Sequence, residues 1–415
     1  RINPYHKDGW EGSGKAEDLY LPGRTTIVAA DAINVLHTNY DGEPAPLADA
    51  HGTQKLTNPE GVWLMVNAPF LDGRIRESAS VRTWGPNFGT KTGRSFTPDG
   101  KIGFEADQGY KGLMMLKFGR GQGFAGPSNY GEYEIWNYNG ETDYQDYRHK
   151  PGNFFWMEDL VYDYEPLNGT SPYYRKNAQL FDDEGNLLTE DTIRCWYSFP
   201  LYKFWSQNYE SNVRRQHGGR TPRYIYRKAE AYLLRAEARG WQDKWGAMLA
   251  DINVIRERAN AKVTFTEADA ASMGMEMVFD ERARELYGEE YRHDEMVRWS
   301  IIYAKTGKAY RGNTYTLGND YEVSLSQNSF YYDRQMDVNN FFRDEVPWFS
   351  YGVKYTMDPK HVWWPVYEPF LIGNVAAKLN QTTGYEGSDD NIEPLTHIVQ
   401  PAGAPNVDPQ YAVEP

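Results

Sequence analysis

Apolar residues recur at helical spacing through residues 222–304, and this periodicity constrains the fold of the 415-residue chain more than any other feature. One apolar stripe predicts a helix over 222–239, and a second predicts a helix over 243–260. Gly240 lies in the turn between them, where it can end the first helix, and Asp243 can cap the start of the second. Two helices joined by a short turn are expected to form an antiparallel hairpin of the tetratricopeptide kind.

Two further helices, predicted over 275–287 and 290–304, carry many Glu and Arg residues. Paired carboxylates can hydrolyse a glycosidic bond, but only when two of them face each other across the bound sugar. Here they alternate with arginines, as in Glu281–Arg284 and Asp294–Arg298, so we predict a partly buried ion-pair network that locks two helices together. The predicted members of this network are Glu281, Arg282, Glu285, Arg292, Asp294 and Arg298.

Residues 80–165 are predicted to be rich in loops, because 13 glycines between Gly85 and Gly140 leave little room for long helices. Aromatic residues alternate with amides and acids in this region. Aromatic rings can stack on the apolar faces of sugars while Asn and Asp bind hydroxyl groups; alternatively, the rings pack the loops onto the helical core. The candidate stacking residues are Trp84, Trp136, Tyr138 and Trp156, followed by Tyr133 and Tyr144, and the candidate hydroxyl partners are Asn137, Asn139 and Asp143.

Three other segments are predicted to be extended. Residues 58–66 read as a turn followed by a buried strand, and residues 180–188 read as a β-hairpin with its turn at Gly185. Residues 192–205 are rich in aromatic and β-branched side chains, which favours a strand.

The composition argues against several classes of protein. The chain has 44 Lys and Arg against 58 Asp and Glu, and a net charge of −14 opposes binding to nucleic acid. The single cysteine, Cys195, excludes an internal disulfide and a cysteine-based zinc site. The histidines show no metal-binding spacing, and no P-loop or nucleophile elbow is present, so we predict no metal, no cofactor and no catalytic residue. Gly121–Gly126 match a dinucleotide fingerprint, but Pro127 follows and no helix is predicted there.

Four short segments occur in an order that is typical of one protein family. They are AEAYLLRAEA at Ala229–Ala238, INVIRERA at Ile252–Ala259, ERAREL at Glu281–Leu286 with Glu290, Arg292, Asp294, Arg298 and Trp299 after it, and a last element with Trp364-Pro365-Val366, Asn374, Leu379-Asn380-Gln381 and Gly384-Tyr385. In this combination the chain resembles the SusD/RagB family over residues 222–387.

The resemblance implies a mainly α fold, a tetratricopeptide-like right-handed superhelix with a loop-rich, partly β variable region. It also implies non-catalytic capture of oligosaccharides or polysaccharides at the cell surface and delivery to a SusC-like TonB-dependent transporter barrel in the outer membrane. Such proteins are lipoproteins, held on the membrane by an N-terminal lipid that this sequence does not contain. Two alternatives stay open: an oligopeptide-binding member of the same family, and, from a different class, a glycoside hydrolase.

The expected organisation has three parts. Residues 1–220 form a loop-rich variable region with candidate ligand-binding loops in 80–165, residues 221–304 form the helical core, and residues 305–415 form an irregular C-terminal region packed on that core. The N-terminal helical part and lipidated cysteine of the family are not visible in the sequence, so we expect them to lie outside these 415 residues.

Overall fold

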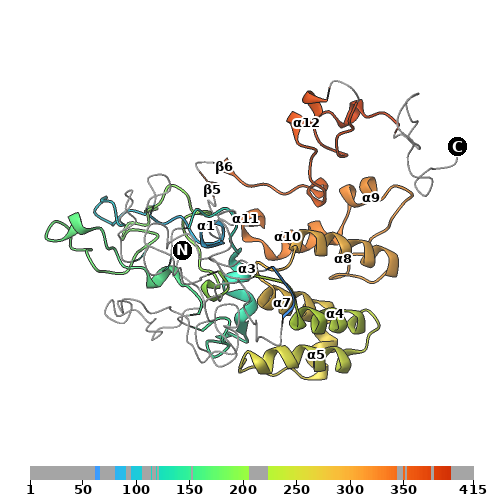
Figure 1. Ribbon diagram of the computed structural model, residues 1–415, viewed down its shortest axis with the longest axis horizontal. Coiled ribbons are helices and arrows are strands. Elements are labelled where there is room, and N and C mark those ends of the chain that lie inside the picture. Colours follow the sequence, from blue (N-terminus) through green and yellow to red (C-terminus); the bar gives the residue numbers. More distant parts are fainter. Residues whose placement is uncertain are drawn as a thin grey trace, which may run out of the picture. The chain divides into compact units, whose positions relative to one another are not determined.

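The structure is a computed structural model, and the residues that it describes fall into two compact units. Described are residues 61–65, 80–89, 95–104, 114, 118, 121–150, 153–204, 223–343, 349–350, 353–374 and 378–393. The first unit runs to Tyr291 and includes Asp337–Thr356, and the second comprises Arg292–Met336 and the chain from Met357 onward. Figure 1 labels the elements of both units along the chain.

An antiparallel pair of helices forms the helical part of the first unit. Helix α4 (Lys228–Gly240) packs against α5 (Trp245–Arg258). Arg235 and Arg239, one turn apart on α4, both pair with Asp251 on α5, at 2.6 Å each. The buried apolar residues that join the two helices include Ala229, Leu233, Ala236, Met248, Leu249, Ile252 and Ile255. The predicted helix hairpin is therefore confirmed in its central part.

The structure corrects where each of the two predicted helices starts. The segment predicted to start the helix at residue 222 contains strand β4 (Arg223–Arg227), which pairs antiparallel with β1 (Gly61–Met65), so the predicted strand at 58–66 is confirmed. The sequence RYIYR places three β-favouring residues between two arginines, and pairing with β1 satisfies its backbone in the extended form. Asp243 does not cap α5; it adopts φ +58° in the turn, and Lys244 is the N-cap.

Two more helices complete this part of the first unit. Helix α6 (Glu267–Met273) was not predicted, although Thr266 and Asp269 form a capping box, which is a sequence signal for a helix start. Helix α7 (Met275–Glu285) contacts α4. Gly240 is needed at this contact, since a Cβ there would lie 2.6 and 2.8 Å from the sulfur atoms of two methionines.

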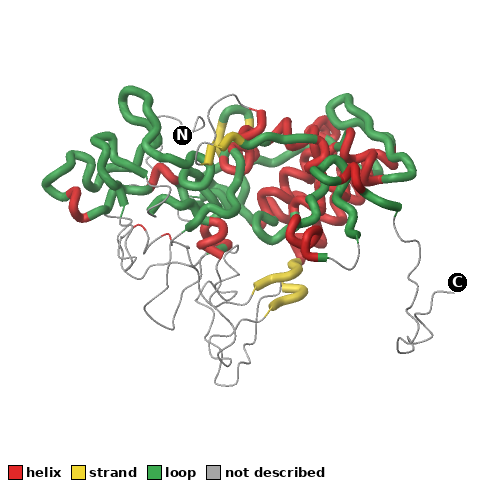
Figure 2. Tube along the Cα trace, turned by 90° about the horizontal axis from the view of Figure 1, so that it is seen from above, coloured by secondary structure: helices red, strands yellow, loops and turns green. Residues whose placement is uncertain are grey.

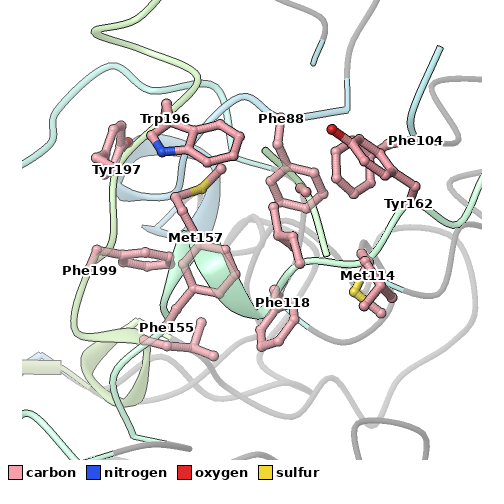
Figure 3. Packing of buried hydrophobic residues seen from close by; sticks show 14 of the residues in the cluster. Phe88, Phe104, Met114, Phe118, Phe155, Met157, Tyr162, Trp196, Tyr197 and Phe199 are labelled. Carbon is pink, nitrogen blue, oxygen red and sulfur yellow. The ribbon is translucent and has the colours of Figure 1, made fainter. Parts of the chain in front are cut away.

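The rest of the first unit is built mainly from loops with a buried aromatic core. Its short described elements are α1 (Ser80–Trp84), α3 (Asn129–Glu132), η3 (Glu134–Trp136), β2 (Asn137–Tyr138), β3 (Glu141–Thr142), η4 (Met157–Asp159), η5 (Glu165–Leu167), η6 (Leu201–Lys203), α11 (Asn340–Arg343), β5 (Phe349–Ser350) and β6 (Val353–Lys354). The described strands form three two-stranded sheets. Figure 2 shows how short these strands are beside the helices and loops. Figure 3 shows rings of the core, among them Phe88, Phe155 and Trp196, packed against one another.

Of the two extended segments predicted after the loops, one is confirmed and one is wrong. The hairpin at 180–188 forms, with Phe181 bridged to Leu187 and Gly185 at φ +84° in the turn. The strand predicted over 192–205 is absent from its described part, 192–204, where Phe199 makes an isolated bridge to Phe155. Trp196, Tyr197 and Phe199, labelled in Figure 3, are instead buried in the core, as is Phe204.

The second unit is more helical than the sequence suggested. It contains α8 (Arg292–Thr306), α9 (Tyr321–Gln327), most of α10 (Phe330–Val338), η8 (Pro359–Val362), α12 (Glu368–Gly373) and η9 (Ser388–Asp390). The prediction of an irregular 305–415 is therefore wrong for α9 and α10, whose starts are marked by Asp320, an N-cap that accepts from the Val323 amide, and by Ser329. Among the described helices, none has the length and apolar character needed to cross a bilayer.

The predicted fold class is confirmed: mainly α, with a tetratricopeptide-like helix pair and a loop-rich, partly β region. The proposed division into 1–220, 221–304 and 305–415 stays a prediction.

Candidate functional site

The three most buried candidate rings cannot offer a face to a ligand. Trp136 is 3% exposed and stacks on His149, with ring centroids 4.5 Å apart, while its Nε1 donates to the Gly131 carbonyl. Trp156 is fully buried and stacks on Tyr133, which is itself 1% exposed. The structure therefore contradicts a stacking role for these three rings, because other side chains already cover them.

The other candidate aromatics are partly buried and have protein partners. Trp84 stacks on Phe204 at 5.3 Å. Tyr144 stacks on the ring of the buried His149, at 5.9 Å. Tyr138 lies under the Arg256 guanidinium at 5.2 Å and accepts a hydrogen bond from it at 3.0 Å. These contacts favour the alternative in which aromatic residues pack the loops.

The three candidate hydroxyl partners build turns. Asn139, at φ +54°, and Gly140, at φ +83°, form the tight turn between β2 and β3, and Asn137 accepts from the Gly140 amide. Asp143 is buried and accepts four backbone N–H groups, two at residues 145–146 and two at 262–263. Of the three side chains, only that of Asn139 is exposed.

A buried ion-pair network surrounds two glutamates of α7. Glu281 pairs with Arg148, Arg256 and Arg284 at 2.7, 3.2 and 2.8 Å. Glu285 pairs with Arg148, Arg227 and Arg258 at 3.2, 3.0 and 2.5 Å. Burial alone would raise the pKa values of both carboxyls, but the arginines hold these pKa values well below the usual range. Paired carboxylates that stay ionised near neutral pH are poorly suited to supply the proton that a glycoside hydrolase needs.

The network connects the loops to the helices. Arg148, from a loop, also pairs with Asp146 at 2.7 Å, and Lys203, at the end of η6, pairs with Glu289 at 2.7 Å. Arg282 pairs with a carboxylate other than Glu281 and Glu285, that of Glu290, at 2.7 Å. The sequence located the carboxylates but could not identify the loop cations, which are more than 80 residues away along the chain.

The remaining predicted members, Arg292, Asp294 and Arg298, lie on α8 in the second unit. Asp294 has a side chain that is 79% exposed, so the predicted burial is wrong for it. It lies in the first turn of α8, where a carboxylate stabilises the helix start, and its Oδ1 is 3.6 Å from Nδ1 of His293. Arg298 pairs with Glu295 at 2.5 Å, and the guanidinium groups of Arg292 and Arg298 lie over the Trp299 ring.

The glycines of the G-x-G-x-x-G match allow close packing. A Cβ at Gly121 would lie 2.0 Å from the Gly85 oxygen, and one at Gly126 would lie 2.8 Å from the Tyr197 ring. Gly123 has φ +61°, which a larger residue rarely adopts. Packing accounts for all three glycines, and within the described residues no cluster of His, Cys, Asp or Glu is arranged to hold a metal ion.

Glu158 is a partly buried acid with a perturbed pKa. Its Oε1 lies 3.4 Å from the Tyr133 hydroxyl. Burial, followed by the nearby Glu132 and Asp159 carboxylates, raises the pKa of Glu158 to about 7. An acid with a raised folded-state pKa stabilises the fold fully only below its unfolded pKa, and this contribution is lost as the pH rises from about 4.5 to about 7.

Replacing Glu158 with glutamine is therefore expected to raise the free energy of unfolding at pH 8 by about 1–3 kcal/mol, and to leave it nearly unchanged at pH 4. The lower end is expected because the side chain is only partly buried and water screens it. Urea denaturation at the two pH values measures the effect, with Glu184→Gln, an exposed carboxylate in the 180–188 hairpin, as the control. An equal change at both pH values would contradict this explanation.

Among the described residues of the second unit, the most exposed aromatic side chains lie close together in sequence. Trp364 is 72% exposed, Tyr367 is 65% exposed and Phe370, on α12, is 66% exposed. Tyr367 and Phe370 touch, with ring centroids 5.5 Å apart. We call these three residues the Trp364 surface. Sequence reasoning missed it, although the Trp363-Trp364-Pro365 run in a segment without helical periodicity was a signal.

The backbone around Trp364 is anchored although its ring is exposed. Trp363 points inward, where its Nε1 donates to the Glu322 carbonyl at 3.0 Å, and the Tyr385 hydroxyl donates to the Trp363 carbonyl at 2.8 Å. The Trp364 ring leans on His293, with centroids 5.1 Å apart. Trp364 therefore has an anchored backbone and a ring that contacts His293 but is otherwise mostly exposed.

Comparison with known proteins identifies the family. A profile of the SusD family matches residues 83–385, more than half of the chain. SusD-like protein P25 of Formosa agariphila is 32% identical over 108 residues, which cover 25% of this chain and 20% of that protein. The crystal structure of a SusD superfamily protein from Bacteroides fragilis is similar at 14% identity with a TM-score of 0.41, over 86% of this chain and 55% of that one. Another from Bacteroides vulgatus is similar at 16% identity with a TM-score of 0.25, over 50% of this chain and 40% of that one.

The chain thus spans about half or less of the length of these relatives. The resemblance that four sequence segments predicted is confirmed by the family profile, and the chain belongs to the SusD family.

Proposed function

We propose that this protein captures a neutral glycan without converting it, and that the Trp364 surface contacts the sugar rings. The observation that carries the proposal is the exposure of Trp364 and Tyr367 on an anchored backbone, in a chain that belongs to the SusD family. Flat aromatic faces match the apolar C–H faces of sugars, and the Tyr367 hydroxyl adds a hydrogen-bonding group. The net charge of −14 favours a neutral over an anionic polysaccharide.

The remaining parts of the proposal rest on the family alone. The glycan is delivered to a SusC-like TonB-dependent transporter barrel, and the protein is a cell-surface lipoprotein of the outer membrane. Recovery of the barrel with the natural protein from outer membranes, in mild detergent, tests this partnership.

Capture of an oligopeptide is the second candidate, and a specific observation favours it. In addition to the aromatic rings, the same segment exposes aliphatic side chains: Ile372 is 71% exposed and Leu379 is 42% exposed. Aliphatic side chains suit apolar peptide side chains better than sugars.

A binding screen separates the two candidates. Calorimetry against amylopectin, laminarin, xylan and galactomannan, with alginate and a casein digest beside them, is expected to find binding to a neutral polysaccharide. Replacing Trp364 with alanine is expected to weaken that binding about thirtyfold, which corresponds to about 2 kcal/mol. Phe124→Ala, at a ring of similar exposure in the first unit, is the matched control and should leave the dissociation constant unchanged. Binding to the digest alone would favour the peptide candidate.

A further inference from the structure

A buried glutamine side chain holds the loop that carries Trp364. Gln381 is 9% exposed. Its Oε1 accepts from the Val366 amide at 2.7 Å and from the Thr382 amide at 2.8 Å, and its Nε2 donates to the Val366 carbonyl at 3.2 Å. The side chain thus binds both backbone groups of Val366, as a neighbouring β-strand would.

Two asparagines repeat this pattern and anchor the glutamine in turn. The Asn391 side chain accepts from the Gln381 amide at 2.8 Å and donates to the Gln381 carbonyl at 2.6 Å. The Asn380 side chain donates to the Ile392 carbonyl at 2.6 Å and accepts from the Ile392 amide at 3.0 Å. Side-chain amides therefore take the place of a β-ladder within the described residues 363–374 and 378–393, where no strand occurs.

We call Gln381, Thr382 and their hydrogen bonds to residues 364–366 the clamp, and it holds the backbone at Trp364 in two places. The Thr382 hydroxyl, on the residue after Gln381, donates to the Trp364 carbonyl at 2.8 Å. Two residues further along the chain, Val366 is held by Gln381. Pro365, which lies between Trp364 and Val366, has a fixed φ. The backbone of Trp364 is therefore ordered before any ligand arrives, although the side chain is mostly exposed.

We propose that Gln381 is a positioning residue, which presets Trp364 for the ligand without touching the ligand itself. This inference rests on the proposed role of the Trp364 surface. A loop that is already ordered loses little conformational freedom on binding, whereas a loosened loop must be ordered at the expense of affinity. Without the clamp, the affinity is expected to fall about tenfold.

The experiment compares four variants with the parent: Gln381→Leu, Gln381→Glu, Trp364→Ala and the double variant Gln381→Leu/Trp364→Ala. Glutamate keeps an acceptor for the two amides but sets its second carboxylate oxygen against the Val366 carbonyl, so its affinity should fall below that of the parent. Gln327→Leu, at an exposed glutamine that ends α9, is the matched control. The readouts are calorimetry with the tightest-binding polysaccharide of the panel, and hydrogen exchange of the Val366 and Thr382 amides without ligand.

The expected result has two parts. In Gln381→Leu the two amides exchange faster, and the affinity falls about tenfold. In the Trp364→Ala background the same change has no further effect, because its action runs through the ring.

Three results overturn the inference: an unchanged affinity in Gln381→Leu, losses that multiply in the double variant, or unchanged exchange at both amides. If Trp364→Ala binds as tightly as the parent, or if no polysaccharide binds, the proposed function fails and the positioning role fails with it. Faster exchange of the Val366 and Thr382 amides in Gln381→Leu would then show only that Gln381 holds the loop in place.

Discussion

Replacing Arg148 with methionine is expected to lower the free energy of unfolding by about 3–5 kcal/mol. The Arg148 side chain is fully buried and pairs with three carboxylates, those of Asp146, Glu281 and Glu285. Methionine fills similar space but removes the cation that the three carboxylates share. Glu281 and Glu285 each keep two arginines, whereas Asp146 loses its ion pair with Arg148, and removing one partner of a buried ion pair is costly. Denaturation in guanidinium chloride at pH 7 measures the loss.

Arg235→Met provides the matched control for this result. Arg235 also pairs with a buried carboxylate, Asp251, but its own side chain is 56% exposed, so the expected loss is below about 1 kcal/mol. The pH dependence is a further check. Glu281 and Glu285 have pKa values that are lowered in the folded state, so the stability they provide is present above their usual value of 4.5 and is lost as the pH falls below it. The deficit of Arg148→Met should therefore shrink in acid; a deficit equal to that of Arg235→Met at pH 7 would contradict the role of the network.

Replacing Trp156 with alanine is expected to lower the free energy of unfolding by about 3–5 kcal/mol and to leave the affinity for glycan unchanged. The indole is fully buried, with ring centroids 4.6 Å from His149, 4.8 Å from Phe154 and 5.8 Å from Tyr133. Removing it leaves a cavity that these rings cannot fill without moving.

Thermal unfolding and calorimetry, both on the same preparation, measure the two quantities for Trp156→Ala. Phe124→Ala, at a ring that is 64% exposed, should cost little stability and serves as the control. A Trp156→Ala variant with parental stability and weakened glycan binding would restore the hypothesis that this ring stacks on the ligand.

The helical part of the fold was predictable because its signal is local. The apolar stripes through Leu233 and Ile252 identified α4 and α5, and the i,i+3 pair of Glu281 and Arg284 forms as expected. The start of α4 was misplaced because residues 223–227 pair with a strand more than 150 residues away, which periodicity within the segment cannot reveal.

The candidate site was poorly predictable for a different physical reason. Tyr, Trp and Gly in loops are compatible with a recognition surface, but a region with few helices must also build its core from such loops, and Trp136 and Trp156 have that role here. Whether an aromatic ring is covered depends on partners far away in sequence, as for Trp84 and Phe204. Trp364 carries the same chemistry and is exposed, so only the structure separates it from the buried rings.

The ion pairs between loop and helix limit how this scaffold can be re-engineered. The segment around Arg148 supplies a cation that Glu281 and Glu285 of α7 both use. A transplanted loop without an arginine or lysine at that place would take one of three cations from each glutamate and leave both to the remaining arginines, at a cost in stability that does not depend on what the loop binds. An exchange of loops between related scaffolds therefore has to transfer the loop cation, Arg148, together with the α7 carboxylates of Glu281 and Glu285.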